Sequence, residues 1–171
     1  MPRLFYALWP TPRVRAALAR AALAVDLREA LAIRADNLHL TLVFLGNVDD
    51  ATCGVLQAAV SPLRVPAFRL DIARTGWWRS SQVAWLAPLD PPAALDELVA
   101  GLTTHVANHA CRLEARPFAP HVTIGRKVRR APRATGDIAV HWPVADYALV
   151  VSEHTPTGSS YRVLARWPLA G

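Results

Sequence analysis

The sequence predicts an α+β fold made of two similar lobes around one cleft. Expected strands and helices follow one another without the strict alternation of a doubly wound parallel sheet. Each half also contains a strand, a helix and a later strand with a His-x-Thr motif, a faint repeat that would place the two motifs face to face. A chain of 171 residues, 53% hydrophobic and 19% charged, suits one folding unit, so residues 1–171 are treated as a single domain.

The first half is expected to contain two strands and two helices. Residues 3–8 are aromatic and aliphatic and are followed by a proline, which indicates a strand. Pro12 suits a first helical turn, and apolar residues recur at helical spacing from there to about residue 25. Residues 37–46, NLHLTLVFLG, are typical of a buried strand, and an aspartate at 49 or 50 can cap a helix that reaches about residue 60.

The second half is expected to be richer in strands. They are predicted at residues 68–73, 82–87, 118–126, 144–152 and 160–167. The segment RTGWWRSS is expected to be the loop between the first two, and its Trp77 and Trp78 could contact nucleic acid or cap the core. Pro91 and Pro92 begin a helix that extends to about residue 108. Residues 127–136, KVRRAPRATG, are expected to form a basic, turn-rich surface segment.

The charge balance allows an anionic partner without proving one. Nineteen Lys and Arg residues against thirteen Asp and Glu give a formal charge of +6, nearly all of it from arginine. Arginine suits phosphate and stacks on bases, although an arginine-rich composition is also expected from a GC-rich genome. Cys53 and Cys111 form no CxxC pair, and the N-terminal apolar run is too short for a signal sequence or a membrane span. We therefore expect a cytoplasmic protein, and a monomer.

The chemistry of the chain is expected at two His-x-Thr motifs. In a strand, alternate side chains share a face, so His39 and Thr41 point one way, and His121 and Thr123 do the same. Random placement would give roughly 0.35 such motifs, so a pair in strand-like contexts favours function. The alternative is that each histidine is a buried residue whose neighbouring threonine satisfies it.

Two imidazoles can divide the work of acid and base near neutral pH. Two nearby hydroxyls could donate hydrogen bonds to the non-bridging oxygens of a phosphate. The chain lacks the clustered carboxylates that would hold Mg²⁺ and the GxxxxGK[ST] loop of an NTPase. The pattern therefore predicts phosphoryl transfer with no metal and no cofactor.

The motifs HLTL and HVTI, about eighty residues apart, resemble those of the two-histidine (2H) phosphoesterase superfamily. Nearly the whole chain resembles the bacterial and archaeal RNA 2′,3′-cyclic phosphodiesterases of that superfamily, once called 2′-5′ RNA ligases. The segments that carry the likeness are RLFYAL, DNLHLTLVFLG, GWWRSSQVAWL, RPFAPHVTIGR and VSEHTPTGSSYRVLARWPL.

This resemblance implies two pseudo-symmetric lobes, each an antiparallel sheet with outer helices, around a central cleft that holds the phosphate. It makes His39 and His121 catalytic and Thr41 and Thr123 phosphate ligands. His121 would act as base on a water while His39 protonates the departing 3′ oxygen, leaving a 2′-phosphomonoester. The implied partner is an RNA with a 2′,3′-cyclic phosphate terminus, or a cyclic nucleotide.

The resemblance also implies a nucleobase site between Arg126 and Tyr6, because an aromatic ring and a guanidinium both stack on bases. Arg126 could instead be a solvated arginine, and Tyr6 a core aromatic. Gly125 departs from the family pattern and leaves the strand end more flexible. His105 and His109 lie at a spacing that could hold a metal, but no third ligand is evident, so surface histidines are favoured.

Alternative functions stay open at this stage. The same chemistry could serve 2′-5′ RNA ligation, cleavage of another cyclic phosphate, or cleavage of a 2′-5′ oligonucleotide. A non-catalytic RNA-end-binding module would keep the cleft but turn nothing over.

Overall fold

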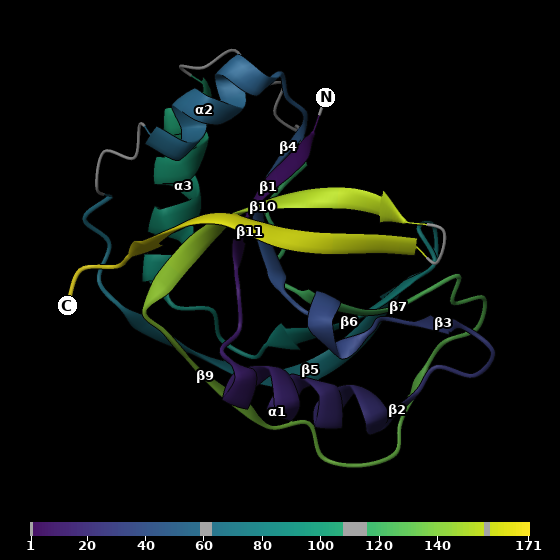
Figure 1. Ribbon diagram of the computed structural model, residues 1–171. Helices are drawn as coiled ribbons and strands as arrows, with labels where there is room; N and C mark the ends of the chain where they lie inside the picture. The colour runs from purple at the N-terminus through teal and green to yellow at the C-terminus, as the bar shows by residue number, and fades with distance from the viewer. Residues whose placement is uncertain (1, 59–62, 108–115, 156–157) are drawn as a thin grey trace.

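The computed structural model describes residues 2–58, 63–107, 116–155 and 158–171. Its centre is a curved antiparallel sheet with helices packed beside it (Figure 1). The helical elements are α1 (Pro12–Leu23), the short 3-10 turn η1 (Ala35–Asn37), α2 (Asp50–Ala58) and α3 (Ala93–Ala107). The strands are β1 (Arg3–Leu8), β2 (Val25–Asp26), β3 (Leu31–Ala32), β4 (Leu40–Asn47), β5 (Phe68–Trp78), β6 (Val83–Pro88), β7 (Val122–Arg126), β8 (Arg133–Ala134), β9 (Val140–Val144), β10 (Asp146–Thr155) and β11 (Gly158–Pro168).

The main sheet has two four-stranded halves that meet at one seam. Its strand order is β11-β10-β1-β4-β7-β6-β5-β9, with β3 added beside β7, and each of these ladders is antiparallel in the described chain. The halves join where Leu40 of β4 pairs with Val122 of β7. The predicted α+β class is confirmed, and a two-fold symmetry between the halves stays a prediction.

Local sequence signals begin the first two helices where they were expected. Thr11 precedes α1, its hydroxyl accepts a hydrogen bond from the Val14 amide at 3.4 Å, and Pro12 occupies the first turn. Asp49 precedes α2 and accepts hydrogen bonds from the amide and hydroxyl of Thr52 at 2.7 and 2.9 Å. These caps satisfy amide groups that have no partner inside the helix.

Strand β1 separates two hydrophobic layers. Leu4, Tyr6 and Leu8 point into the main core, which they share with apolar residues of α1 and α3. Phe5, Ala7 and Trp9 point to the opposite face and pack with Ala148 and Val150 of β10. Both faces of β1 are therefore apolar and buried, although only one faces the helices.

Several predicted boundaries move. The strand expected over residues 37–46 begins only at Leu40, and the one expected over 118–126 begins at Val122, so each histidine lies just before its strand. The end predicted for the third helix, residue 108, lies outside the described residues. Strand β9 and the short strands β2, β3 and β8 were not predicted.

Two surface predictions are also wrong in part. The RTGWW part of the expected loop continues β5, because the hairpin with β6 extends to Trp78 and the Thr75 hydroxyl donates to the Trp85 carbonyl at 3.0 Å. In the basic segment 127–136, Val128 is fully buried and its carbonyl accepts a hydrogen bond from the Trp77 indole at 2.9 Å. One apolar residue thus anchors an otherwise exposed stretch.

Candidate active site

The seam of the sheet brings the two His-x-Thr motifs together. Because Leu40 faces Val122 in an antiparallel ladder, the position of His39 lies opposite Thr123, and that of Thr41 opposite His121. Leu40 and Val122 are fully buried in the core. The two histidines and two threonines therefore gather on the other face, where all four line one pocket.

Each histidine is oriented by the same local contact. Nδ1 of His39 lies 2.7 Å from the carbonyl oxygen of Asn37, and Nδ1 of His121 lies 2.7 Å from that of Ala119. A carbonyl only accepts, so each Nδ1 carries a hydrogen and donates it. In the neutral ring this leaves the lone pair on Nε2, the nitrogen that can take or give a proton in the pocket.

The Nε2 of His39 already has a partner. It lies 3.1 Å from Oγ1 of Thr41, which donates its hydrogen when the imidazole is neutral. This contact joins the first and third residues of the motif, as their shared strand face predicts. An anion in the pocket could receive the threonine hydrogen instead.

Aromatic rings hold both imidazoles. The His39 ring stacks on Trp9 with centroids 5.5 Å apart, lies 4.9 Å from Phe5 and meets the edge of Tyr161 at 5.0 Å. The His121 ring meets Trp78 edge-on at 4.5 Å. The packing limits the rotation of each imidazole and excludes water from one side of it.

Burial lowers the pKa of both imidazoles. The pKa of His39 falls from 6.5 to about 4, mainly because the charged ring would lose its hydration, and His121 and Arg126 add repulsion. The hydrogen bond to Asn37 opposes this change only in part. Burial and Arg126 also lower the pKa of His121. His39 is therefore neutral in the free protein at neutral pH, and an anion would favour its protonation.

The pocket, here called the motif pocket, has a volume of about 660 Å³. Its charged lining residues are Arg3, Arg34 and Arg126, without a carboxylate among its lining residues. One part of the pocket rim is held next to the first motif. The side-chain amide of Asn37, two residues before His39, donates a hydrogen bond to the Ser159 carbonyl at 2.7 Å. The size and the positive charge suit a phosphorylated small molecule or the end of a nucleic acid.

The structure separates the two predicted nucleobase residues. Arg126 is exposed, lines the motif pocket and acts electrostatically on both histidines. The prediction that Tyr6 contacts the nucleobase is wrong, because its side chain is fully buried and its ring packs near Tyr147 and Trp167 in the main core. The aromatic residue of β1 that lines the pocket is its neighbour Phe5.

Sequence reasoning also missed residues that surround the histidines. Phe5 and Trp9 could have been found, because they alternate with Tyr6 on the first strand and lie on the opposite face. Trp78 was considered only as a loop residue or a core cap. Tyr161 gives no local signal, since the β10–β11 hairpin brings it to His39 from far along the chain.

Among residues 2–58, 63–107, 116–155 and 158–171, no group of three or more His, Cys, Asp or Glu side chains could hold a metal ion. Of the two histidines considered as metal ligands, His105 lies on α3 and His109 lies outside the described residues. No helix in the described part of the chain is long and apolar enough to cross a membrane.

Two imidazoles and two hydroxyls on one face of such a sheet are typical of two-histidine phosphoesterases. The chain belongs to the 2′-5′ RNA ligase superfamily, whose family model matches residues 10–154. The chain is 34% identical over 144 residues to the RNA 2′,3′-cyclic phosphodiesterase of Escherichia coli K12, a match that covers 80% of this chain and 78% of that protein. It is 33% identical to the Thermus thermophilus protein of the same name, over 99% and 91% of the two chains.

Solved structures show the same architecture. A crystal structure described as a phosphoesterase superposes with a TM-score of 0.90 at 29% identity and covers 99% of both chains. E. coli LigT complexed with 3′-AMP superposes with a TM-score of 0.85 at 30% identity and covers 100% of both chains. The likeness therefore extends over both halves of the sheet.

Proposed function

We propose that this protein hydrolyses RNA 2′,3′-cyclic phosphate ends to 2′-phosphomonoesters by a metal-independent reaction of two histidines. The observation that carries the proposal is the seam, which gathers two identically oriented imidazoles and two threonines in one positively charged pocket. Relatives that match most of the chain bear the name of this activity. The bound 3′-AMP of the E. coli structure supports a ribose phosphate as the kind of ligand.

The residues of the pocket can perform the reaction as follows. One imidazole takes a proton from a water, whose oxygen forms a bond to phosphorus. The bond from phosphorus to the 3′ oxygen breaks, and the second imidazole gives its proton to that oxygen. The product carries a 3′ hydroxyl and a 2′ phosphate, and Thr41 and Thr123 donate to the non-bridging oxygens throughout.

The family resemblance assigns the base to His121 and the acid to His39. A His39 pKa of about 4 means that this acid must gain its proton with the substrate. The negative charge of the cyclic phosphate favours that uptake, because an anion beside an imidazole stabilises its protonated form. We propose further that Arg126, exposed at the pocket, lies against the terminal base.

The test is hydrolysis of a nucleoside 2′,3′-cyclic phosphate in EDTA, with the product identified as the 2′- or 3′-phosphate. We expect the 2′ product, and a loss of about 10²- to 10⁴-fold in kcat for His39→Ala and for His121→Ala. His141→Ala is the matched control, because His141 is exposed on β9, where it contacts Asp71. Full activity in both motif variants, or tight binding of the cyclic phosphate without turnover, would contradict the proposal.

A further inference from the structure

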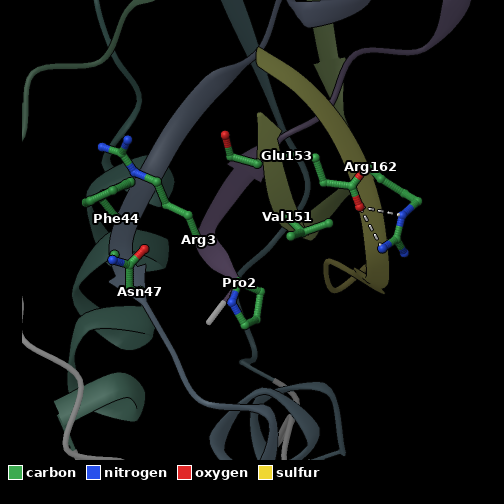
Figure 2. A pocket seen from close by; sticks show the side chains of 9 residues that line it. Pro2, Arg3, Phe44, Asn47, Val151, Glu153 and Arg162 are labelled. Carbon is green, nitrogen blue, oxygen red and sulfur yellow. Dashed lines mark hydrogen bonds and ion pairs between the residues drawn. The ribbon is translucent and has the colours of Figure 1, made fainter. Parts of the chain in front are cut away.

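A second pocket adjoins the motif pocket on the same face of the sheet. It has a volume of about 720 Å³ and lies over the N-terminal end of β1, between β4 and the β10–β11 hairpin (Figure 2). Arg3, Phe44 and Ser152 line both pockets, so the two pockets share part of their wall. Arg3 and Phe5 are alternate residues of β1, which places the two pockets one after the other along that strand.

The charged side chains of this adjoining pocket differ in whether they are paired. Figure 2 shows Arg162 held by Glu153 on one side, and the two side chains form an ion pair of 3.0 Å. Arg3 lies across the pocket with its guanidinium over the Phe44 ring, 4.9 Å from the ring centre. In the part of the chain that the structure describes, Arg3 forms no ion pair. Its charge is therefore free for an anion at the boundary between the pockets.

The shape of an RNA end requires a second site of this kind. When a terminal 2′,3′-cyclic phosphate lies at the histidines, the 5′ side of the same ribose continues into a phosphodiester and another nucleotide. That phosphodiester carries one negative charge a few ångströms from the reacting phosphorus. A cationic group at the edge of the motif pocket, followed by a cavity large enough for a nucleoside, matches this sequence of groups.

We propose that the adjoining pocket holds the nucleotide next to the RNA end, and that Arg3 contacts the phosphodiester joining it to the terminal nucleotide. The inference rests on the proposed function. It adds the side from which the RNA enters and a preference for oligonucleotides over mononucleotides. The neutralised pair Glu153–Arg162 leaves the far wall without net charge, which suits a ribose and a base more than a second phosphate.

The experiment compares kcat/KM for a dinucleotide ending in a 2′,3′-cyclic phosphate with that for the corresponding mononucleotide. We expect the wild-type ratio to exceed one, and Arg3→Ala to lower it by about tenfold. Asn47→Asp adds a negative charge in the adjoining pocket only. It should also lower the ratio, because the added carboxylate repels the phosphodiester. Arg13→Ala, an exposed arginine on α1, is the matched control and should leave the ratio unchanged.

Salt gives a second readout that a merely structural role of Arg3 would not change. Salt screens the attraction between a cationic side chain and a phosphate. The fall of 1/KM for the dinucleotide with rising salt should therefore become shallower in Arg3→Ala.

Four results would overturn the inference. Equal kcat/KM for both substrates in the wild-type protein would remove the second nucleotide site and leave the proposed function intact. An Arg3→Ala variant with the wild-type ratio and salt slope would do the same. A loss caused by Arg34→Ala instead would place the RNA at a part of the motif pocket that the adjoining pocket does not share. Failure to hydrolyse either substrate would overturn the proposed function, and this inference with it.

Discussion

Leu40 of β4 pairs with Val122 of β7 at the seam of the sheet, and each is the middle residue of a His-x-Thr motif. Both side chains are fully buried in the core, so the histidine and threonine side chains of the motifs point to the opposite face of the sheet, into the motif pocket. An antiparallel pairing centred on this residue pair sets each histidine across from the threonine of the other motif.

The hydroxyls of Thr41 and Thr123 should matter for turnover rather than for folding. Valine has a similar shape but cannot donate to a phosphate oxygen, so Thr41→Val or Thr123→Val should lower kcat/KM by about 10- to 10³-fold. Serine keeps the donor, so the corresponding serine variants should retain most of the activity. Steady-state kinetics with a 2′,3′-cyclic nucleotide measures this, and equal losses for valine and serine would argue against a hydroxyl role.

Phe5 and Tyr6 should respond differently to the same substitution. Tyr6 is fully buried in the main core, so Tyr6→Leu should lower the free energy of unfolding by about 1–3 kcal/mol, with a much smaller change in kcat/KM. Phe5→Leu removes a ring that packs against His39 and should lower kcat/KM as well as stability. Urea unfolding and kinetics on both variants test this. A Tyr6→Leu protein of normal stability and low activity would restore Tyr6 as a substrate contact.

Gly76 should be needed to place His121. A Cβ at residue 76 would overlap the ring of Trp85, which packs against Trp78, and Trp78 in turn contacts His121. Gly76→Ala should therefore cost about 1–3 kcal/mol of stability and lower kcat more than KM changes. Gly54→Ala is the control, because nothing lies within 4 Å of its added Cβ on α2 and alanine favours the helix. Unchanged kcat in Gly76→Ala would show that the packing of Trp85 does not position His121.

The pH profile should show the low pKa of His39. Activity needs one neutral and one protonated imidazole, so kcat/KM should rise as the first proton leaves the pair in the free enzyme. Because burial holds the pKa of His39 at about 4, this rise should occur near pH 4 rather than 6.5. Stopped assays from pH 3 to 9 test this, with stability checked at each pH. A rising limb near pH 6.5 would contradict the burial argument.

The same profile is expected whichever histidine is the acid, so a different substrate must assign the roles. A cyclic phosphate with sulfur in place of the 3′ oxygen has a leaving group that needs no protonation. Removal of the acid should then cost far less than it does with the oxygen substrate. We expect this rescue for His39→Ala and not for His121→Ala. Rescue of His121→Ala alone would reverse the assignment.

Much of this protein could be predicted from short-range sequence patterns. The first-turn proline Pro12, the cap at Asp49 and the His-x-Thr repeats at His39 and His121 depend on neighbours within a few residues, and the structure places each of them close to where it was expected. The α+β class follows from the order of these elements. The orientation of β1 was harder to predict. Both of its faces are apolar, and alternation alone does not say which face points into the pocket.

Tertiary structure decided which residues surround the motifs. Tyr161 reaches His39 through the β10–β11 hairpin, and Trp78 reaches His121 because β5 continues past the expected strand end. The His-x-Thr motifs thus follow from sequence by itself, because strand alternation is local. The closeness of the two motifs, the low pKa of His39 and the choice of Phe5 over Tyr6 depend on strand pairing between distant segments, which no local pattern encodes.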